Sequence, residues 1–291
     1  MTISLALDEG TRFLSKPSRS PRLDAEVLLS HVLGETRTRL YTLAFQSLSE
    51  LDWSRYHELL EQRREGVPVA YLVGTREFYS RRFIVSPEVL IPRPETELLV
   101  EHSLAILGRA GLIRPRVLEL GTGSGCVAVS IAMESPLAAV RATDISAGAL
   151  QIAAENVGAH HLERRIRLFE GDLFEAIPPT SGPHGQRKRF DLIVSNPPYV
   201  GTDSGPRPED NVMRYEPSQA LFAGRDGLGV ITRLVAEAPG WLNPGGYLLL
   251  EMAPFQIEGV EARMVEHGFH DTHIVADFSG LPRVLMGRWE A

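Results

Sequence analysis

Four consecutive residues, Asn196-Pro197-Pro198-Tyr199, have the groups needed to hold a planar NH2 group. The prolines have no N–H, so the backbone presents mainly carbonyl acceptors here, and Asn196 adds a side-chain carbonyl. The preceding residues 191–195 are mostly apolar and β-branched, which predicts a buried strand ended by the two prolines. A conjugated nitrogen, such as that of a carboxamide or of the adenine amine, is what this tip would hold.

A second candidate site is the glycine-rich turn Gly121-Thr122-Gly123-Ser124-Gly125, which follows a predicted strand over 117–120. Such a turn lets a ligand approach the backbone closely. The dinucleotide fingerprint requires a small residue three positions after the second glycine, whereas that position is Cys126 here. The spacing therefore departs from that of a pyrophosphate-binding turn.

Acidic residues lie at the ends of the neighbouring predicted strands. Asp144 can accept both hydroxyls of a ribose, and Asp172 can accept the exocyclic amine of an adenine whose ring packs on Leu173 or Phe174. Glu119, just before the glycines, is placed to hold an ammonium or an ordered water. These features describe a nucleoside cofactor without a pyrophosphate, and S-adenosylmethionine fits, with its methyl group facing Asn196.

The elements that must position these residues form three segments. Residues 1–73 read as a small helical domain, with a helix over 23–33 that ends at Gly34 and another that begins at a capping box at Ser49. Residues 74–95 predict a β-hairpin with a turn at Ser-Arg-Arg, followed by a rigid, proline-containing linker. In residues 96–291 helices alternate with strands near 117–120, 140–144, 166–172, 191–195, 241–251, 273–276 and 284–287, which predicts an α/β, Rossmann-like, doubly wound sheet.

Composition narrows the classes of function. The chain has 291 residues, a formal net charge of -7 and 43% hydrophobic residues, with a pI near 5.8. The acidic balance argues against broad adhesion to nucleic acid, so we expect no direct nucleic-acid binding. The single cysteine, Cys126, cannot form an internal disulfide, metal-site spacing is absent, and neither a signal peptide nor a membrane span is indicated. We therefore expect a cytoplasmic protein without a metal.

Taken together, the motifs resemble those of the release factor glutamine N5-methyltransferases. The resemblance extends over nearly the whole chain, and the proline-rich segment is its most specific part. The residues that carry it are Gly66-Val67-Pro68-Val69-Ala70-Tyr71-Leu72, Arg76-Glu77-Phe78, Ile91-Pro92-Arg93-Pro94-Glu95-Thr96-Glu97, Glu119 to Gly125, Asn196 to Tyr199, Arg214-Tyr215-Glu216-Pro217, Asp277, Gly280 and Arg283.

This resemblance implies methyl transfer from S-adenosylmethionine to the side-chain amide of the glutamine in the Gly-Gly-Gln loop of class-1 peptide chain release factors. It implies cofactor contacts from the glycine turn, Asp144, the position of Leu173, and Asn196. Asn196, Pro197, Pro198 and Tyr199 would hold the glutamine, and Asn196, Pro197 and Tyr199 would serve catalysis. The helical domain would dock the release factor.

Some features are left open. Leu173 stands where relatives often have an aromatic residue, and Met252-Ala253 replaces a common small pair, which leaves the cofactor packing undefined. Residues 201–214 are a candidate lid, residues 177–189 a solvated excursion, and the role of Arg93 and Glu95 is undecided between anchoring the hairpin and bordering the cofactor.

Four other functions are compatible with parts of the pattern. A glutamine methyltransferase of a ribosomal protein would be separated by offering both substrates. A DNA adenine N6-methyltransferase would show a steep salt dependence of DNA affinity. A dehydrogenase would bind NAD without S-adenosylmethionine, and a non-enzymatic binding module would bind the cofactor without methyl transfer.

Overall fold

The computed structural model describes residues 1–16, 18–109, 111–178 and 189–290. The chain forms two compact units, of which one comprises Met1–Thr75 with Asp210–Tyr215 and the other Arg76–Glu209 with Glu216–Ala291. We call them the helical unit and the sheet unit and describe each by itself. None of the helices in the described ranges combines the length and the apolar character needed to cross a bilayer.

The helical unit contains α1 (Ile3–Phe13), α2 (Pro21–Leu33), α3 (Arg37–Thr42), α4 (Glu50–Arg64), α5 (Val69–Val73) and α9 (Asp210–Tyr215). The predicted helix stop is confirmed, because Gly34 caps α2 with a left-handed φ of 64°. The predicted start is confirmed as well, since the Ser49 hydroxyl accepts the Asp52 N–H at 3.1 Å. An apolar core that includes Leu28, Tyr56 and Leu60 joins these helices.

A two-stranded β-hairpin, β1 (Thr75–Phe78) and β2 (Arg81–Ile84), follows the helical segment, as predicted. Its turn lies at Tyr79 and Ser80, which have φ values of 50° and 58°. The turn therefore lies one residue before the predicted Ser-Arg-Arg centre, and both arginines belong to β2. Two successive left-handed residues match the twist of a tight hairpin.

The sheet unit has seven strands in the order β5-β4-β3-β6-β7-β9-β8. Strands β3 to β7 are parallel, and β9 runs antiparallel to both β7 and β8. The strands are β3 (Arg116–Leu120), β4 (Ala139–Asp144), β5 (Ile166–Glu170), β6 (Phe190–Ser195), β7 (Leu242–Glu251), β8 (Phe269–Ala276) and β9 (Pro282–Trp289). The predicted doubly wound sheet is confirmed. The last two strands are longer than predicted. Polar residues interrupt their apolar pattern, so the sequence indicated only the apolar part of each strand.

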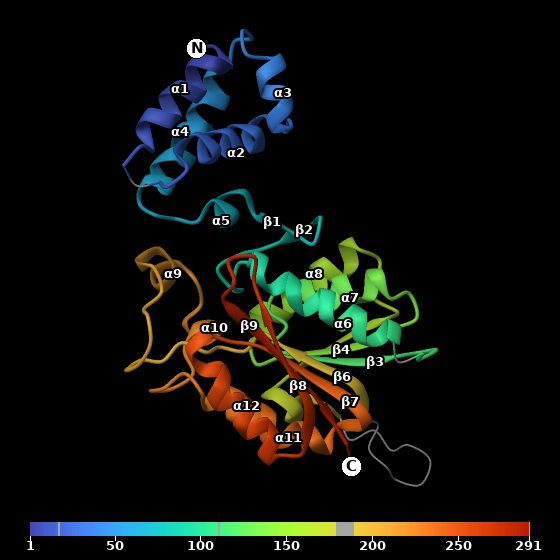
Figure 1. Cartoon of the computed structure of the whole chain (residues 1–291). Helices are drawn as coiled ribbons and strands as arrows, with labels where there is room; N and C mark the ends of the chain where they lie inside the picture. Colours follow the sequence, from blue (N-terminus) through green and yellow to red (C-terminus); the bar gives the residue numbers. More distant parts are fainter. Residues whose placement is uncertain (17, 110, 179–188, 291) are drawn as a thin grey trace. The chain divides into compact units, whose positions relative to one another are not determined.

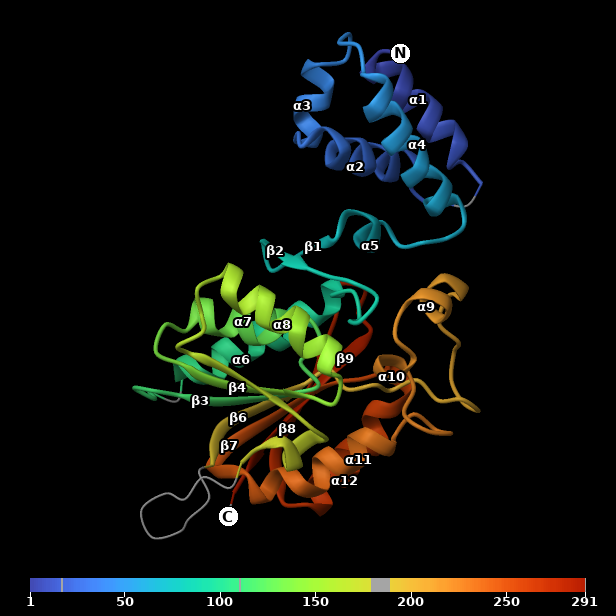
Figure 2. The ribbon, with the colours of Figure 1, turned by 180° about the vertical axis from the view of Figure 1, so that it is seen from behind.

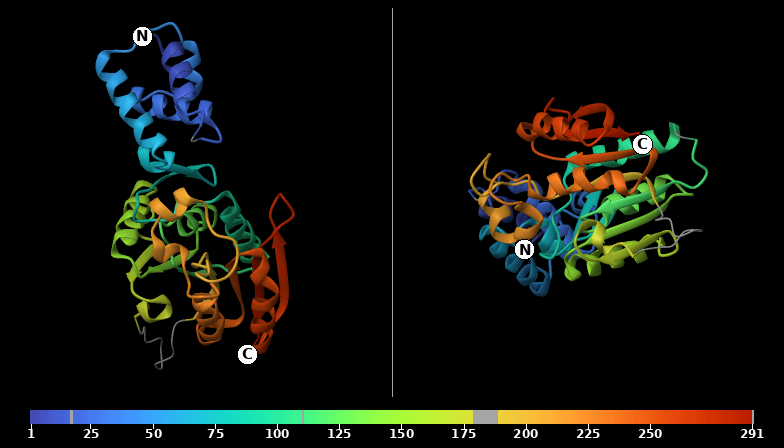
Figure 3. Two further views of the ribbon diagram at one scale, coloured as in Figure 1. Left: turned by 90° about the vertical axis from the view of Figure 1, so that its left-hand side faces the viewer. Right: turned by 90° about the horizontal axis from the view of Figure 1, so that it is seen from below.

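Helices cover both faces of this sheet (Figures 1 and 2). On one face lie α6 (Glu97–Arg109), α7 (Cys126–Glu134) and α8 (Ala147–Ala159), and on the other lie α11 (Gly229–Glu237) and α12 (Ile257–Glu266). Short turns lie at α10 (Ser218–Leu221) and at the 3-10 helices Pro94–Thr96, Leu173–Ala176, Ala238–Gly240 and Pro254–Gln256. Figure 3 shows α12 alongside the C-terminal strands at one end of the sheet. Each face has its own apolar core, as both are covered.

The strand order creates one switch point, between β3 and β6. From β3 the chain proceeds outward through β4 and β5, and it then returns to the other side of β3 as β6. In sheets of this kind, ligands bind outside the carboxyl ends of the strands at such a point. Leu120, Asp144 and Ser195 end the three strands that meet there.

Candidate active site

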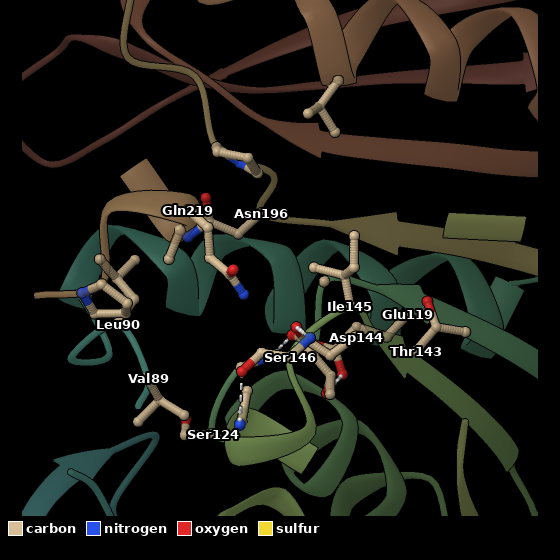
Figure 4. Close-up of a pocket in the computed structure, with 18 of the residues that line it drawn as sticks. Val89, Leu90, Glu119, Ser124, Thr143, Asp144, Ile145, Ser146, Asn196 and Gln219 are labelled. Carbon is tan, nitrogen blue, oxygen red and sulfur yellow. Dashed lines mark hydrogen bonds between the residues drawn. The ribbon is translucent and has the colours of Figure 1, made fainter. Parts of the chain in front are cut away.

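A cavity of about 360 Å³ lies at the carboxyl ends of β3, β4 and β6 in the sheet unit (Figure 4). Ten of the residues proposed from sequence line it: Glu119, Gly121, Thr122, Gly123, Ser124, Asp144, Asp172, Leu173, Asn196 and Pro198. Three others, Gly125, Pro197 and Tyr199, are outside its lining. The structure thus brings residues from four separate strand ends to one place.

The glycine turn bends the chain from β3 into α7. Gly121, Gly123 and Gly125 have φ values of 72°, 55° and 78°, in the left-handed region that favours glycine. A Cβ atom on Gly125 would lie 3.3 Å from the Cβ of Ala153, so α8 packs tightly against this position. Above Gly121 and Gly123 there is open space, which lets a ligand lie on the backbone.

The buried Glu119 side chain connects this turn to the start of α7. Its Oε2 accepts the Thr122 hydroxyl at 2.6 Å and the backbone N–H of Ala128 at 3.1 Å. Burial raises the pKa of this carboxyl to about 8, because removal from water disfavours its charged form. A role for Glu119 in holding an ammonium or a water stays a prediction. No group of His, Cys, Asp and Glu side chains suited to a metal ion occurs within the described ranges.

Asp144 faces the cavity opposite Asn196 (Figure 4). Its Oδ2 accepts the N–H of Gly123 at 2.8 Å and its Oδ1 accepts the N–H of Ser146 at 3.0 Å. Burial raises the pKa of Asp144, while these backbone donors act in the opposite direction. Each oxygen keeps capacity for a further hydrogen bond. The next residue, Ile145, is 61% exposed and lines the same cavity with an apolar side chain.

Asp172 and Leu173 follow β5 at another wall of the cavity. Asp172 Oδ2 accepts Arg233 Nη1 at 2.8 Å, so this carboxylate already has a cationic partner that the sequence did not indicate. Leu173 has a φ of 46°, which is strained for a side chain branched at Cγ and is the kind of conformation that gathers at ligand sites. Both residues stay candidates for contact with an adenine.

The Asn196 to Tyr199 tip is held by groups from other segments. The Ser195 hydroxyl donates to the Leu120 carbonyl at 2.6 Å, and Gln256 Nε2 donates to the Tyr199 carbonyl at 3.0 Å. Burial raises the pKa of Tyr199 to about 12. The Asn196 Nδ2 donates to the Thr96 hydroxyl at 3.1 Å.

Two acceptors at this tip are free. Among the described residues, no hydrogen bond reaches Asn196 Oδ1 or the carbonyl oxygen of Pro197. Both oxygens belong to the motif that we expect to hold an NH2 group. The arrangement therefore leaves two acceptors for two N–H donors.

Arg93 is both an anchor and a wall of the cavity. It pairs with Glu216 at 2.5 Å, and the other oxygen of Glu216 accepts the N–H of Ile91 at 3.0 Å. Glu216 is only 5% exposed, so this carboxylate ties the proline-rich segment to the segment after α9. Arg93 thus anchors the proline-rich segment and lines the cavity, while a contact of Arg93 or Glu95 with the cofactor stays a prediction.

Sequence reasoning missed several residues of the cavity. These are Thr96, Ile145, Ser146, Arg233, the segment 88–90 and the segment 217–222. Ile145 and Ser146 could have been found, since they follow Asp144 directly. The others come from segments far away along the chain, and only the tertiary fold brings them to the site.

The remaining predicted segments divide. Residues 201–209 have no regular structure, whereas 210–215 form α9 in the helical unit, where the Tyr215 hydroxyl donates to the Glu65 carbonyl at 2.9 Å. A lid role stays a prediction. Most of the predicted excursion, residues 179–188, lies outside the described residues.

Cys126, buried in the first turn of α7, has a pKa raised to about 12 by burial, which fits a packed helix residue.

Comparison with known proteins covers almost the whole chain. Residues 6–74 match the PrmC N-terminal domain, and residues 94–206 match the methyltransferase small domain. The release factor glutamine methyltransferase of Koribacter versatilis is 40% identical over 289 residues, covering 99% of each chain. That of Salmonella typhimurium is 39% identical over 275 residues, covering 94% of each.

A solved structure supports the fold alone. The T. thermophilus 16S rRNA N2 G1207 methyltransferase, in complex with AdoMet and guanosine, superimposes with a TM-score of 0.52 at 22% identity. The match covers 74% of this chain and 50% of that one. The expected methyltransferase sheet is thereby confirmed. The chain is about 40% identical to these relatives over nearly its full length, and it therefore belongs to the release factor glutamine methyltransferase family.

Proposed function

We propose that this protein transfers a methyl group from S-adenosylmethionine to the side-chain amide nitrogen of the glutamine in the Gly-Gly-Gln loop of class-1 peptide chain release factors. The observation that carries the proposal is the pair of free acceptors formed by Asn196 Oδ1, whose residue lines the cavity, and by the carbonyl of the next residue, Pro197. Membership of the family supplies the kind of substrate.

The residues present fit S-adenosylmethionine. The glycine turn offers open backbone at Gly121 and Gly123 without the spacing of a pyrophosphate site. Asp144 supplies carboxylate acceptors for ribose hydroxyls, and Ile145 supplies an exposed apolar surface for a base. When bound, the cofactor would provide an electrophilic methyl group on a sulfonium.

The chain's own contribution to the reaction is orientation. An amide nitrogen is a weak nucleophile, because its lone pair is delocalised into the carbonyl. Asn196 Oδ1 and the Pro197 carbonyl would each accept one N–H, which fixes the amide plane and favours positive charge developing on nitrogen. The new bond would join this nitrogen to the methyl carbon that the cofactor supplies, and the bond from that carbon to sulfur would break, leaving a neutral thioether. One N–H proton is then lost to solvent, leaving an N-methyl amide.

Tyr199 does not act as a base in this scheme. Its hydroxyl keeps its proton near neutral pH, because burial raises its pKa to about 12. We assign to Tyr199 the packing of the amide plane, as the motif predicts. No strong general base is required, since nitrogen loses its proton only after it has gained the methyl group.

Labelled methyl transfer tests this function. The full-length protein is incubated with methyl-labelled S-adenosylmethionine and a class-1 release factor, with a variant of the factor lacking the Gly-Gly-Gln glutamine as control. We expect label on the unmodified factor alone. Label that persists on the variant would overturn the glutamine assignment, and label on a ribosomal protein in preference to the factor would move the substrate to that class.

We further propose that the helical unit docks the release factor. Deletion of residues 1–73 should raise the KM for the factor while S-adenosylmethionine binding, measured by calorimetry, changes little. Because the deletion also removes the Glu65 partner of Tyr215, Tyr215→Phe is the matched control. An unchanged KM after deletion contradicts the docking role. A cytoplasmic location and the absence of direct nucleic-acid binding stay predictions.

A further inference from the structure

Thr96 occupies a central position that the motifs alone do not explain. It ends the 3-10 turn Pro94–Thr96, lines the cavity and is only 3% exposed. Its hydroxyl accepts the NH2 group of Asn196 at 3.1 Å. Thr96 therefore contacts the one side chain that offers a carbonyl to the substrate amide.

Glu251 lies on the other side of this hydroxyl. In the parallel pairing of β6 with β7, Ser195 is opposite Leu250, which places Glu251 beside Asn196 at the strand ends. The Glu251 side chain is buried, with 2% exposure of the residue, and it hydrogen-bonds to Thr96. Its Oε2 has no hydrogen-bond partner among the described residues.

Hydroxyl chemistry gives this chain of contacts a direction. A threonine hydroxyl has one proton to donate and two lone pairs to accept with. The Thr96 oxygen accepts from the Asn196 NH2 group, so its own proton is free to point to Glu251, which in its ionised form can only accept. The amide of Asn196 is then fixed with NH2 toward Thr96 and Oδ1 toward the cavity.

The charged groups around Glu251 are engaged elsewhere. Arg93 pairs with Glu216 at 2.5 Å, and Arg283 pairs with Asp277 at 2.8 Å. Glu95 and Tyr199 also act on the Glu251 carboxyl through their charge or dipole, and neither is a hydrogen-bond partner of it. This leaves Thr96 as the group through which Glu251 acts on the site.

Resting on the proposed function, we propose that Thr96 and Glu251 are positioning residues that set the polarity of the Asn196 amide, and that this polarity makes the site select a carboxamide over a carboxylate. With Oδ1 toward the cavity, Asn196 accepts from a substrate NH2 and repels a carboxylate oxygen. A flipped amide would present NH2 instead and would favour the glutamate form of the same loop.

The first test compares Thr96→Val, which keeps the shape but loses the hydroxyl, with Thr96→Ser, which keeps the hydroxyl. We expect Thr96→Val to lower kcat about tenfold, with the KM for the release factor and the Kd for S-adenosylmethionine changed by less than about threefold. Thr96→Ser should retain most of kcat. Equal kcat in all three proteins would overturn the proposal.

A second readout measures selectivity without turnover. The enzyme is saturated with S-adenosylhomocysteine, and calorimetry gives the Kd of the release factor and of its Gln→Glu variant in the Gly-Gly-Gln loop. We expect the wild type and Thr96→Ser to prefer the glutamine form. Thr96→Val should lose most of that preference, which simple loosening of the fold would not produce, and an unchanged ratio in Thr96→Val would refute the inference.

Glu251 is tested in the same two assays. Glu251→Leu should reproduce the loss of preference, and the Thr96→Val/Glu251→Leu double variant should be no worse than Thr96→Val alone, since both act through one contact. Additive losses would contradict a shared role. If Thr96→Val does not fold, Thr96→Ala and Glu251→Leu carry the same expectations.

The control for loss of a buried hydroxyl is Ser103→Ala on α6. Ser103 is fully buried, and its hydroxyl has no partner among the described residues. This variant should keep the wild-type kcat and preference. Failure of the proposed function is distinguishable, because the wild type would then transfer no label to the release factor at all.

Discussion

The two sides of the cavity are built differently. On the cofactor side, Glu119 and Asp144 bind backbone and side-chain donors that lie 2 to 21 positions away along the chain. On the acceptor side, Asn196 is bound by a residue 100 positions away and Tyr199 by one 57 positions away. The glycine turn of the cofactor side is thus a local structure, whereas the acceptor side and the Asp172–Arg233 pair are assembled by the fold.

Because of this difference, a substitution can impair either cofactor binding or positioning of the substrate amide. A local turn formed by glycines and carboxylates tolerates changes elsewhere in the molecule, because its hydrogen bonds close within one βαβ unit. The acceptor tip depends on contacts from the proline-rich segment, β7 and the region before α12, so its geometry is sensitive to packing across the sheet unit. Variants should therefore affect cofactor binding and turnover separately.

The largest expected effect is on the pH dependence of stability. The pKa of Glu119 is raised from 4.5 to about 8 by burial, so between these values the folded protein holds a proton that the unfolded chain has lost. Stability therefore falls as pH rises through this window. Glu119→Gln should remove on the order of 3 kcal/mol of that fall between about pH 5 and pH 8, measured by urea unfolding.

The matching acceptor-side variant is Glu251→Gln, whose carboxyl has a pKa raised to about 7. The pH range between the unfolded and the folded pKa is narrower for Glu251 than for Glu119. Glu251→Gln should therefore reduce the fall of unfolding free energy with pH by less than Glu119→Gln does. A larger flattening for Glu251→Gln would break the comparison, since the acceptor side would then contain the more strongly perturbed carboxyl.

Asn196→Ala is expected to reduce turnover at least tenfold, because the main side-chain acceptor for the substrate amide is lost. Hydrogen bonds of this kind contribute on the order of 1 to 3 kcal/mol. Steady-state kinetics gives kcat, and calorimetry should show a smaller loss in cofactor affinity. Unchanged turnover would remove Asn196 from its assigned role.

Asp144→Ala should weaken cofactor binding more than it lowers turnover. Loss of the carboxylate removes the ribose acceptor and leaves the N–H groups of Gly123 and Ser146 without their partner. We expect the Kd for S-adenosylmethionine to rise about tenfold in calorimetry, with kcat at saturating cofactor affected less. A drop in kcat at unchanged Kd would show that the two sides are not separable.

Asp172→Asn is the smallest change. The Asp172–Arg233 pair is partly exposed, and such pairs contribute about 0 to 1 kcal/mol. We expect a rise in the Kd for S-adenosylmethionine of only about twofold to fivefold. A rise as large as that for Asp144→Ala would show that Asp172 is a principal acceptor for the base.

The same contrast explains how far the sequence could be read. The glycine turn, Asp144 and the strand before Asn196 were predictable, because each follows from spacing within one strand–turn–helix unit. The helix stop at Gly34 and the start at Ser49 were predictable for the same reason. Arg233 and the Thr96 contact with Asn196 were not, because their partners are set by strand order and by packing between segments.

The hairpin turn shows a smaller limit of the same kind. The sequence indicated a hairpin, but the choice between Tyr79-Ser80 and the following arginines depends on the twist of the paired strands. Neither Tyr nor Ser is a usual residue for a left-handed turn. The contact of Asn156 with both backbone groups of Ile84 fixes β2 against α8 and is not visible in the local sequence.

The burial of Cys126 has a practical consequence for measuring motion in this enzyme. It is the single cysteine of the chain, and a thiol whose pKa is raised to about 12 holds almost no thiolate near neutral pH. A cysteine introduced at an exposed position would therefore react with a maleimide dye far faster than the native one. Site-specific fluorescent labelling can thus proceed in the wild-type background, without first replacing a residue that lines the cavity.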